Sequence, residues 1–526
     1  MKTKSYIFKG VLASMVLAGS LVSCSEDTMD DINKDNSHTL DAPARFILTD
    51  VITSTAQNNT GGDINTYMMS YVEHEVGVHN QLWRAEGRQG EPNTASTFNN
   101  TWANLYSTLK NARFIIDKCS EGNSEAKNYS TKGMGEVMAA YNSAILTDMF
   151  GDVPFTNAAQ PTSITNHMTN DYMNPTLDKQ EAIYTAINAY LDAAITDLPK
   201  GDANSVGSQD LLYGGNTSLW LKFAYGLKAR YMMHLLYRSA NRTADLEKII
   251  EYCNKSFASV SEQAAFNIYN GTNLNPTFDF QCSRDGLGAS QSMANKLVAR
   301  QDPRERRVYF DPNSWVQLTG TDDPAINLGP NGKTIQAQSY YTYSMFMYAQ
   351  TAPVLLLSYH EVQFLKAEAL ARLGKTEEAQ AVLKNAVVAS IANTEVSITA
   401  ALNAPTVVGY GGLTETTSAI TPEEAATYFD SKVLPLFKAN PLKEVMNQKY
   451  LGMWGANGES EETYNDIRRL KALGEGDFIT LENPNKFPLR LPYGSDDTTT
   501  NPNVKSAFGD GMYVYSENVW WAGGTR

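Results

Sequence analysis

The sequence predicts a mainly α-helical fold, in which tetratricopeptide-like helix pairs form a scaffold with a large, irregular, loop-rich face and few short strands. Three observations support this prediction. Apolar residues recur at helical spacing, a glycine separates two such segments, and long intervening stretches are rich in Asn, Gly and Pro. Apolar residues at i, i+3, i+4 and i+7 share one face of a helix, and that face must pack against a neighbour.

The helical segments follow one another along most of the chain. Apolar stripes occupy residues 102–116, 137–148, 183–198, 220–235, 246–257, 362–373, 379–387 and 425–436. Trp102 and Trp220 lie on these stripes, so we expect both indoles in the core. Short turns between consecutive stripes favour antiparallel helix pairs.

Gly374 marks the clearest of these pairs. The stripe that begins at Val362 stops at Gly374, and glycine suits the left-handed position that follows a helix. Glu377 and Glu378 then lie in the first turn of the next helix, where carboxylates face the positive end of its dipole. Small side chains would let the two helices approach closely; they are alanines 367, 369, 371 and 379. This arrangement is typical of a tetratricopeptide unit.

Two long stretches interrupt the helical pattern. Residues 269–352 and 392–420 are predicted to be loop insertions within a single domain that spans residues 43–526. Loops of this length in a compact protein usually carry function. We therefore expect the helices to be the scaffold and the loops to carry recognition.

The N-terminus has the features of an export signal. Residues 1–23 contain three lysines followed by the apolar run 11–23, which is too short to span a bilayer as a helix. Residues 21–24 (LVSC) resemble a bacterial lipobox, so Cys24 is predicted to carry the fatty acyl chains that anchor the protein to a membrane. The alternative is an ordinary secretory signal with a chance cysteine. The acidic residues 24–42 are predicted to be a flexible tether.

Composition limits the partners. The chain has 57 acidic and 43 basic residues, a net charge of −14, which argues against nucleic acid and against attachment to anionic lipid through a basic patch. Contact with the membrane should therefore run through the lipid anchor alone. The remaining cysteines are Cys119, Cys253 and Cys282, none in a CxxC pair, and the sequence does not select a disulfide among them.

The motifs of common enzymes are incomplete, so we predict a protein that is not an enzyme and needs no cofactor. His74 and His79 flank Glu75, but they are five residues apart, whereas a zinc-protease helix needs histidines four apart. A pair of carboxylates such as Glu73 and Glu75 keeps a carbohydrate-active hydrolase open as the alternative. A structural calcium at Asp322-Asp323 rests on those two acids alone.

Several motifs, in a fixed order, resemble one known family. They are the lipobox and residues 147–155 (TDMFGDVPF), 219–235, 359–369, 448–450, 465–469 and 487–492 (FPLRLP). Together they resemble the SusD/RagB-like nutrient-binding outer-membrane lipoproteins of Bacteroidetes. The resemblance implies a lipoprotein on the outer face of the outer membrane. It also implies that the lipoprotein forms a lid over a SusC-like TonB-dependent transporter. The lipoprotein would capture a nutrient, commonly a glycan or oligosaccharide, for that transporter. A peptide ligand remains an alternative.

Aromatic residues outside the helical stripes are the candidate ligand contacts. Sugars offer apolar CH faces and hydroxyl rims, which suit aromatic platforms flanked by planar polar groups. The candidate residues are Trp83, Arg84, Asn93, Phe278, Trp315 and Tyr340, with Phe280 and Tyr341 nearby. The resemblance implies that one N-terminal and one mid-chain aromatic hold the ligand, and Trp83 and Trp315 occupy comparable places. For each loop aromatic, packing that anchors the loop is the competing interpretation.

Overall fold

The computed structural model describes residues 42–88, 94–161, 169–333 and 336–526. Residues Ala44–Arg526 form one compact unit, and the description below concerns this unit. The predicted signal peptide, Cys24, nearly all of the tether and Asn93 lie outside the described residues. Helices account for 59% of the described residues and the strands there are few and short, which confirms the predicted fold class.

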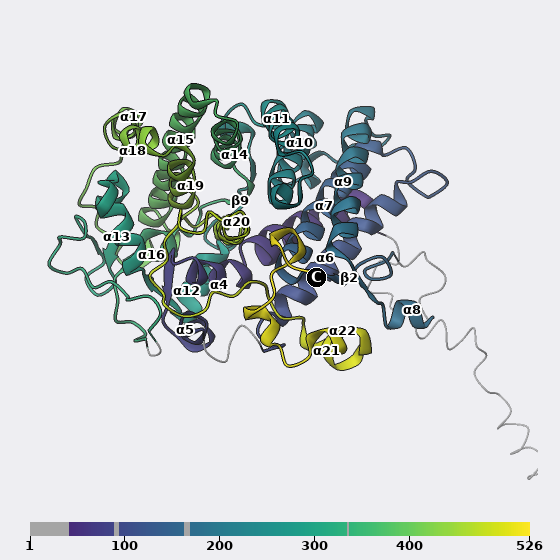
Figure 1. Cartoon of the computed structure of the whole chain (residues 1–526), viewed down its shortest axis with the longest axis horizontal. Coiled ribbons are helices and arrows are strands. Elements are labelled where there is room, and N and C mark those ends of the chain that lie inside the picture. The colour runs from purple at the N-terminus through teal and green to yellow at the C-terminus, as the bar shows by residue number, and fades with distance from the viewer. Residues whose placement is uncertain (1–41, 89–93, 162–168, 334–335) are drawn as a thin grey trace, which may run out of the picture. The chain divides into compact units, whose positions relative to one another are not determined.

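The long helices lie side by side in a row, each packed against the next (Figure 1). In packing order they are α6 (Asn99–Lys118), α7 (Tyr129–Phe150), α9 (Gln180–Asp197), α10 (Thr217–His234), α11 (Arg242–Lys255), α14 (Tyr359–Arg372), α15 (Thr376–Leu402) and α19 (Pro441–Gly452). α3 (Ala44–Ser54) packs on α6, and α20 (Ser460–Ala472) contacts α4 (Asp63–Tyr71). These helices carry all but the last of the predicted apolar stripes, and Trp102 and Trp220 are buried as expected.

Helix α7 is buried on all sides rather than on one face. Small residues make this possible, because a Cβ at Gly133 would lie 2.8 Å from Leu198 Cγ and one at Gly135 would lie 2.8 Å from Ile115 Cγ2. The side chains of Leu198 and Ile115 therefore pack directly on the α7 backbone. α7 is the centre of the N-terminal half of the row.

The turn between α14 and α15 has the predicted left-handed glycine. Gly374 has φ +72°, and the Lys375 N–H donates to the Leu370 carbonyl over 2.9 Å, which closes the end of α14. A second, smaller core lies between this pair and the helices that follow, α17 (Pro422–Tyr428), α18 (Leu434–Ala439) and α19. It includes Phe364, Leu383 and Phe437.

The strands of the described residues form four small sheets. β1 (Glu75–Gly77) pairs with β5 (Leu287–Ala289), β2 (Val153–Pro154) with β3 (Leu177–Asp178), and β4 (Ala264–Phe266) with β9 (Val354–Leu357), all antiparallel. The fourth sheet has the order β7 (Val316–Gln317), β6 (Tyr309–Asp311), β8 (Tyr343–Ser344).

Two predicted loops contain more regular structure than expected. Residues 269–352 include the helices α12 (Pro276–Arg284) and α13 (Gln291–Arg300) and the strands β5 to β8. Residues 392–402 continue α15, so the second loop starts only after Leu402 and includes α16 (Pro405–Gly409). The β-branched residues of this stretch have low helix propensity, but buried Ile398 packs in the main core and keeps the segment helical.

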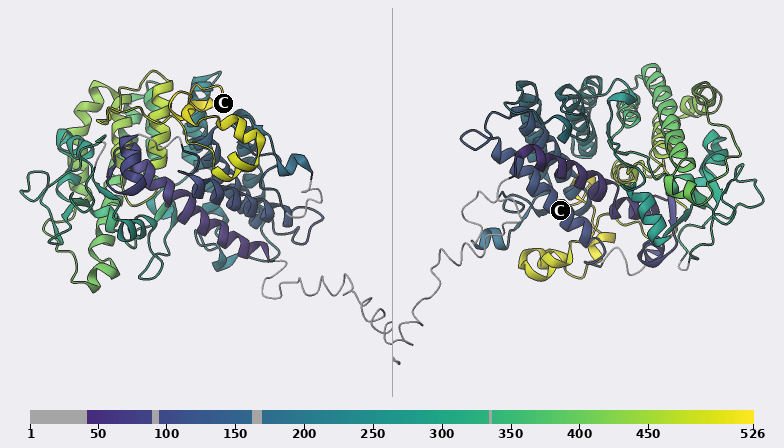
Figure 2. Two further views of the ribbon diagram at one scale, coloured as in Figure 1. Left: turned by 90° about the horizontal axis from the view of Figure 1, so that it is seen from below. Right: turned by 180° about the vertical axis from the view of Figure 1, so that it is seen from behind.

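The C-terminal segment returns to the first half of the row (Figure 2). It carries the short helices α21 (Ser495–Thr500) and α22 (Pro502–Phe508), and the buried Trp521 donates its indole N–H to Asp148 of α7 over 2.8 Å. The remaining short helices are α5 (Asn80–Gly87) and α8 (Asn170–Met173). None of the helices in the described part of the chain combines the length and apolar character needed to cross a membrane.

Candidate ligand-binding site

Trp315 occupies an uncommon backbone conformation in the connection between β6 and β7. The Asp311 carboxylate accepts hydrogen bonds from the Asn313 N–H over 3.0 Å and from the Ser314 hydroxyl over 2.7 Å, which shapes a tight turn. Trp315 then has φ +56°, in the left-handed region that favours glycine. For a bulky side chain this conformation costs on the order of 1–3 kcal/mol, and such strain is concentrated at functional sites.

The Trp315 indole belongs to a cluster of aromatic rings. Its centroid lies 5.2 Å from that of Tyr348 at an interplanar angle of 90°, and 5.7 Å from that of Phe310. Tyr348 stacks on Tyr343 at 5.7 Å and contacts Phe278 edge to face at 6.0 Å. The cluster brings together residues from α12, the fourth sheet and the 3₁₀ helix Met345–Tyr348.

A cavity of about 480 Å³ opens beside this cluster. It is lined by Phe278, Cys282, Trp315, Tyr348, Thr406, Val407, Tyr410 and Gly412. Phe278 and Trp315 were predicted as ligand contacts; Cys282, Tyr348 and Tyr410 were not. The one signal that could have revealed Tyr410 is its glycine-rich setting at residues 409–412 (GYGG).

The chemistry of the lining is aromatic and neutral. The described residues around the cavity include no charged side chain, and they offer hydroxyl groups from Thr406, Tyr348 and Tyr410. Burial raises the pKa of Tyr348 well above its ordinary value. Partial shielding from water and the neighbouring Asp279 carboxylate raise the pKa of the Cys282 thiol to about 11, although the residue is exposed, so both groups stay protonated near neutral pH. Such a lining suits a neutral ligand with apolar faces and hydroxyl groups.

The segment of residues 413–418, here called the strap, fixes the backbone of Trp315 from the other side. The Thr414 N–H donates to the Trp315 carbonyl and the Gln317 N–H donates to the Thr414 carbonyl, each over 2.9 Å. The Gln317 side-chain oxygen accepts the N–H groups of Thr416 and Thr417 over 3.0 and 3.1 Å. Trp315 is therefore held between its own turn and the strap.

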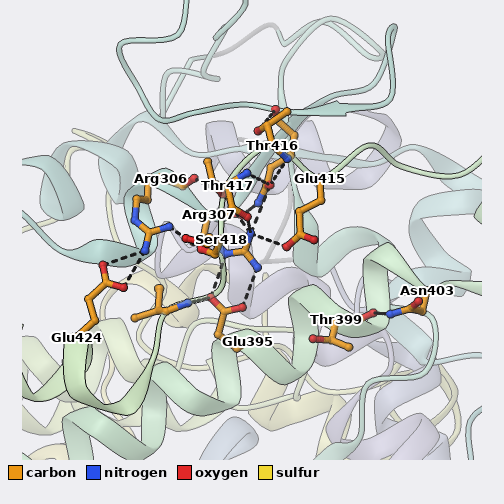
Figure 3. Close-up of polar contacts among 12 residues, drawn as sticks. Arg306, Arg307, Glu395, Thr399, Asn403, Glu415, Thr416, Thr417, Ser418 and Glu424 are labelled. Atoms are coloured by element: carbon orange, nitrogen blue, oxygen red, sulfur yellow. Dashed lines mark hydrogen bonds and ion pairs between the residues drawn. The ribbon is translucent and has the colours of Figure 1, made fainter.

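Arg307 ties the strap to helix α15 (Figure 3). Its guanidinium donates to both carboxylate oxygens of Glu395 over 3.1 and 2.9 Å, to Glu415 over 2.9 Å and to the Thr417 carbonyl. The Arg307 side chain is 1% exposed, so these charge-assisted bonds are largely shielded from water. Arg306 adds a second tie, donating to the Ser418 carbonyl over 2.7 Å.

Three of the predicted contacts lie elsewhere among the described residues. Trp83 and Arg84 are on α5, where the Arg84 guanidinium lies 6.0 Å from the centroid of the half-buried Trp83 ring. Tyr340 is 63% exposed and its ring packs against Tyr341 at 5.3 Å. None of the three is among the residues that line the cavity at Trp315. Their predicted role in binding stays a prediction.

The carboxylates considered for a hydrolase have structural partners. Glu73 accepts the N–H groups of Glu482 and Asn483 over 2.8 and 2.7 Å. Glu75 is buried and accepts hydrogen bonds from Ser344 and Trp454 over 2.6 and 3.0 Å. His74, also buried, contacts the Ser460 hydroxyl and the Tyr450 carbonyl. Each of these side chains is therefore bound within the folded core.

The acidic side chain considered for a calcium site also has a structural role. Among the described residues, no three or more His, Cys, Asp or Glu side chains gather in a group that could hold a metal ion. At the site considered for calcium, the Asp323 carboxylate accepts the N–H groups of Thr319 and Ala325 over 3.2 and 3.0 Å. This carboxylate stabilises a turn of its own loop.

Comparison with known proteins gives one consistent result. Residues 35–493 match the model of a family described as SusD-like, starch-binding and associating with the outer membrane. A crystal structure of a SusD/RagB family protein from Bacteroides thetaiotaomicron is similar at 53% sequence identity and a TM-score of 0.87, covering 92% of this chain and 100% of that one. No match was found among the curated proteins.

More distant structures share the fold. A chitin-binding protein is 19% identical with a TM-score of 0.67, over 91% of this chain and 100% of that one. A SusD homologue from Bacteroides fragilis is 18% identical with a TM-score of 0.66, over 92% of this chain and 100% of that one.

Proposed function

Because this chain belongs to the SusD-like family of starch-binding proteins that associate with the outer membrane, we propose that it captures a neutral glycan at the cell surface. The protein is held at the membrane by lipid on Cys24 and passes the glycan to a SusC-like TonB-dependent transporter. Its family membership confirms the resemblance seen in the sequence motifs. The bound sugar, the anchor and the transporter belong to the proposal.

The aromatic cavity at Trp315 is the observation that carries the proposal. A pyranose ring has an apolar CH face that stacks on an indole, and its hydroxyl rim meets Thr406 and the tyrosine hydroxyls. The absence of charge from the described lining favours neutral sugars over uronic, sialylated or sulfated ones. The strap and the Asp311 turn hold Trp315 in its strained conformation, so the indole platform is in place before ligand arrives.

Binding can be tested with the lipid-free protein. Calorimetry against neutral malto-, chito-, cello- and xylo-oligosaccharides, against acidic oligosaccharides and against peptides should detect one neutral glycan series. Trp315→Ala should weaken that binding about thirtyfold, since an aromatic hot spot contributes ~2 kcal/mol or more. Tyr129→Ala removes an exposed tyrosine at the start of α7, outside the cavity lining, and serves as the matched control. Preferred binding of acidic glycans or peptides, or full binding by Trp315→Ala, would contradict the proposal.

Cys282 provides an independent reporter of the site. It lines the cavity and is exposed, whereas Cys119 and Cys253 are buried. A neutral thiol reagent at mildly alkaline pH should therefore modify Cys282 first, and the bound glycan should slow that reaction. Equal rates with and without saturating glycan would place the ligand elsewhere.

A further inference from the structure

We propose that Tyr410 is an aromatic clamp whose side chain turns onto a sugar ring held on Trp315. This inference rests on the proposed function and adds a residue and a movement to it. Tyr410 lines the same cavity as Trp315, but it comes from the C-terminal end of α16 rather than from the aromatic cluster.

The Tyr410 ring is free in the state described by the structure. It is 91% exposed, the most exposed of the large apolar side chains, while it borders a cavity whose other aromatic walls are buried or half-buried. An aromatic ring held in water beside an apolar cavity gains stability by covering a ligand there. The position of the ring is therefore suited to contact that forms only when a ligand is present.

The backbone around Tyr410 is a closed helix end. The Gly411 N–H donates to the Val408 carbonyl over 3.2 Å and the Gly412 N–H donates to the Val407 carbonyl over 3.0 Å, which caps α16. Gly411 and Gly412 have the positive φ of +116° and +82° that such an end requires. The backbone therefore holds Tyr410 in place, and the freedom of the ring lies in its exposed side chain.

The chain beyond the glycines is fixed at both ends. On the N-terminal side, the Thr406 N–H donates to the Gln350 side-chain oxygen over 2.9 Å and Val407 is buried. On the C-terminal side, the Thr414 N–H donates to the Trp315 carbonyl. Arg307 holds the strap through the contacts drawn in Figure 3. The backbone on both sides of Tyr410 is thereby fixed, so the proposed movement is a rotation of the exposed Tyr410 side chain.

Such a clamp has a kinetic signature. A platform that is always in place changes both association and dissociation, whereas a ring that closes after binding acts mainly on dissociation. A glycan ring has an apolar face on each side, so a second aromatic surface can cover the face turned away from Trp315. Slow release would keep the sugar on the protein until the transporter takes it.

The test measures association and dissociation rates of maltoheptaose, chitohexaose, cellohexaose and xylohexaose on the lipid-free protein. For the sugar that binds, Tyr410→Ala should speed dissociation about tenfold with little change in association. Tyr410→Phe keeps the ring and should behave like the wild type, and Tyr129→Ala, at an exposed tyrosine of α7 that does not line the cavity, should have no effect. If Trp315→Ala weakens binding and Tyr410→Ala does not, the clamp is overturned while the proposed function stands. Failure of the wild type to bind any of the four sugars counts against the proposed function itself.

The same rates separate a moving ring from a fixed one. If Tyr410→Ala slows association as much as it speeds dissociation, Tyr410 is a fixed platform and the movement is refuted.

Discussion

The strain at Trp315 predicts that glycine is better tolerated there than alanine. Both variants remove the indole and its contacts with Tyr348 and Phe310, so the two should lose ligand binding equally. They differ in the backbone, because alanine at φ +56° keeps the left-handed penalty of about 1–2 kcal/mol, whereas glycine does not. Glycine loses about 0.5–1 kcal/mol more on folding through its flexibility. Trp315→Gly should therefore be more stable than Trp315→Ala by about 0.5–1 kcal/mol.

The expected thermal shift is small but measurable. At about 2.1 cal/mol/K for each of roughly 480 residues, the unfolding entropy is about 1 kcal/mol/K, so the two variants should melt about 0.5–1 °C apart. Replicate melting curves followed by helical circular dichroism can resolve this difference. Trp83→Ala and Trp83→Gly are the control pair, since Trp83 lies within helix α5 and glycine should there be the less stable variant by about 1 kcal/mol. Equal stability at Trp315, or the same order at both positions, would refute the argument from strain.

Substitutions at three further positions test the scaffold and the anchor. Gly374→Val should lower stability by about 1–3 kcal/mol, because valine is strained at φ +72°, whereas Gly374→Asn should cost less; equal melting temperatures for the two and the wild type would contradict this. Burial raises the pKa of Glu75 from 4.5 to about 8. Between pH 4.5 and 8, the Glu75 carboxyl group is therefore protonated in the folded protein and ionised in the unfolded chain. Stability should fall as the pH rises through this window by on the order of 1 kcal/mol per unit, and Glu75→Gln should flatten the decline in urea midpoints between pH 5 and 8. Cys24→Ala should abolish acylation and release the protein from the membrane fraction, and its recovery there in acylated form would reject the lipid anchor.

Local patterns in the sequence were sufficient for the scaffold. Trp102 and Trp220 are buried because helical spacing places them on the apolar faces, and Gly374 ends its helix because only a few residues adopt the left-handed conformation. The end of α15 was missed because propensity is a local property, whereas Ile398 is held by the core contributed from distant parts of the chain.

The candidate site was only partly predictable. Trp315 and Phe278 could be selected as aromatic residues outside the stripes, but so could Tyr340, and composition alone does not show which of them share a cavity. The sequence does not predict that Tyr348 lines the cavity, because the rings that pack against Tyr348 come from α12 and β6 rather than from adjacent residues. The fixed backbone of Trp315 depends on Arg307 and the strap, a tertiary arrangement that no local pattern encodes.

The cavity at Trp315 is assembled from four separate stretches of chain: α12, the β6–β7 turn, the 3₁₀ helix Met345–Tyr348 and the segment around Tyr410. Residues more than a hundred positions apart must meet before a sugar can bind, so a partly folded chain has no site. Ligand at a hundred times its dissociation constant would stabilise the native state by about 2.7 kcal/mol. The proposed glycan would thus protect correctly folded molecules, and their resistance to heat and proteases would rise with the supply of that glycan.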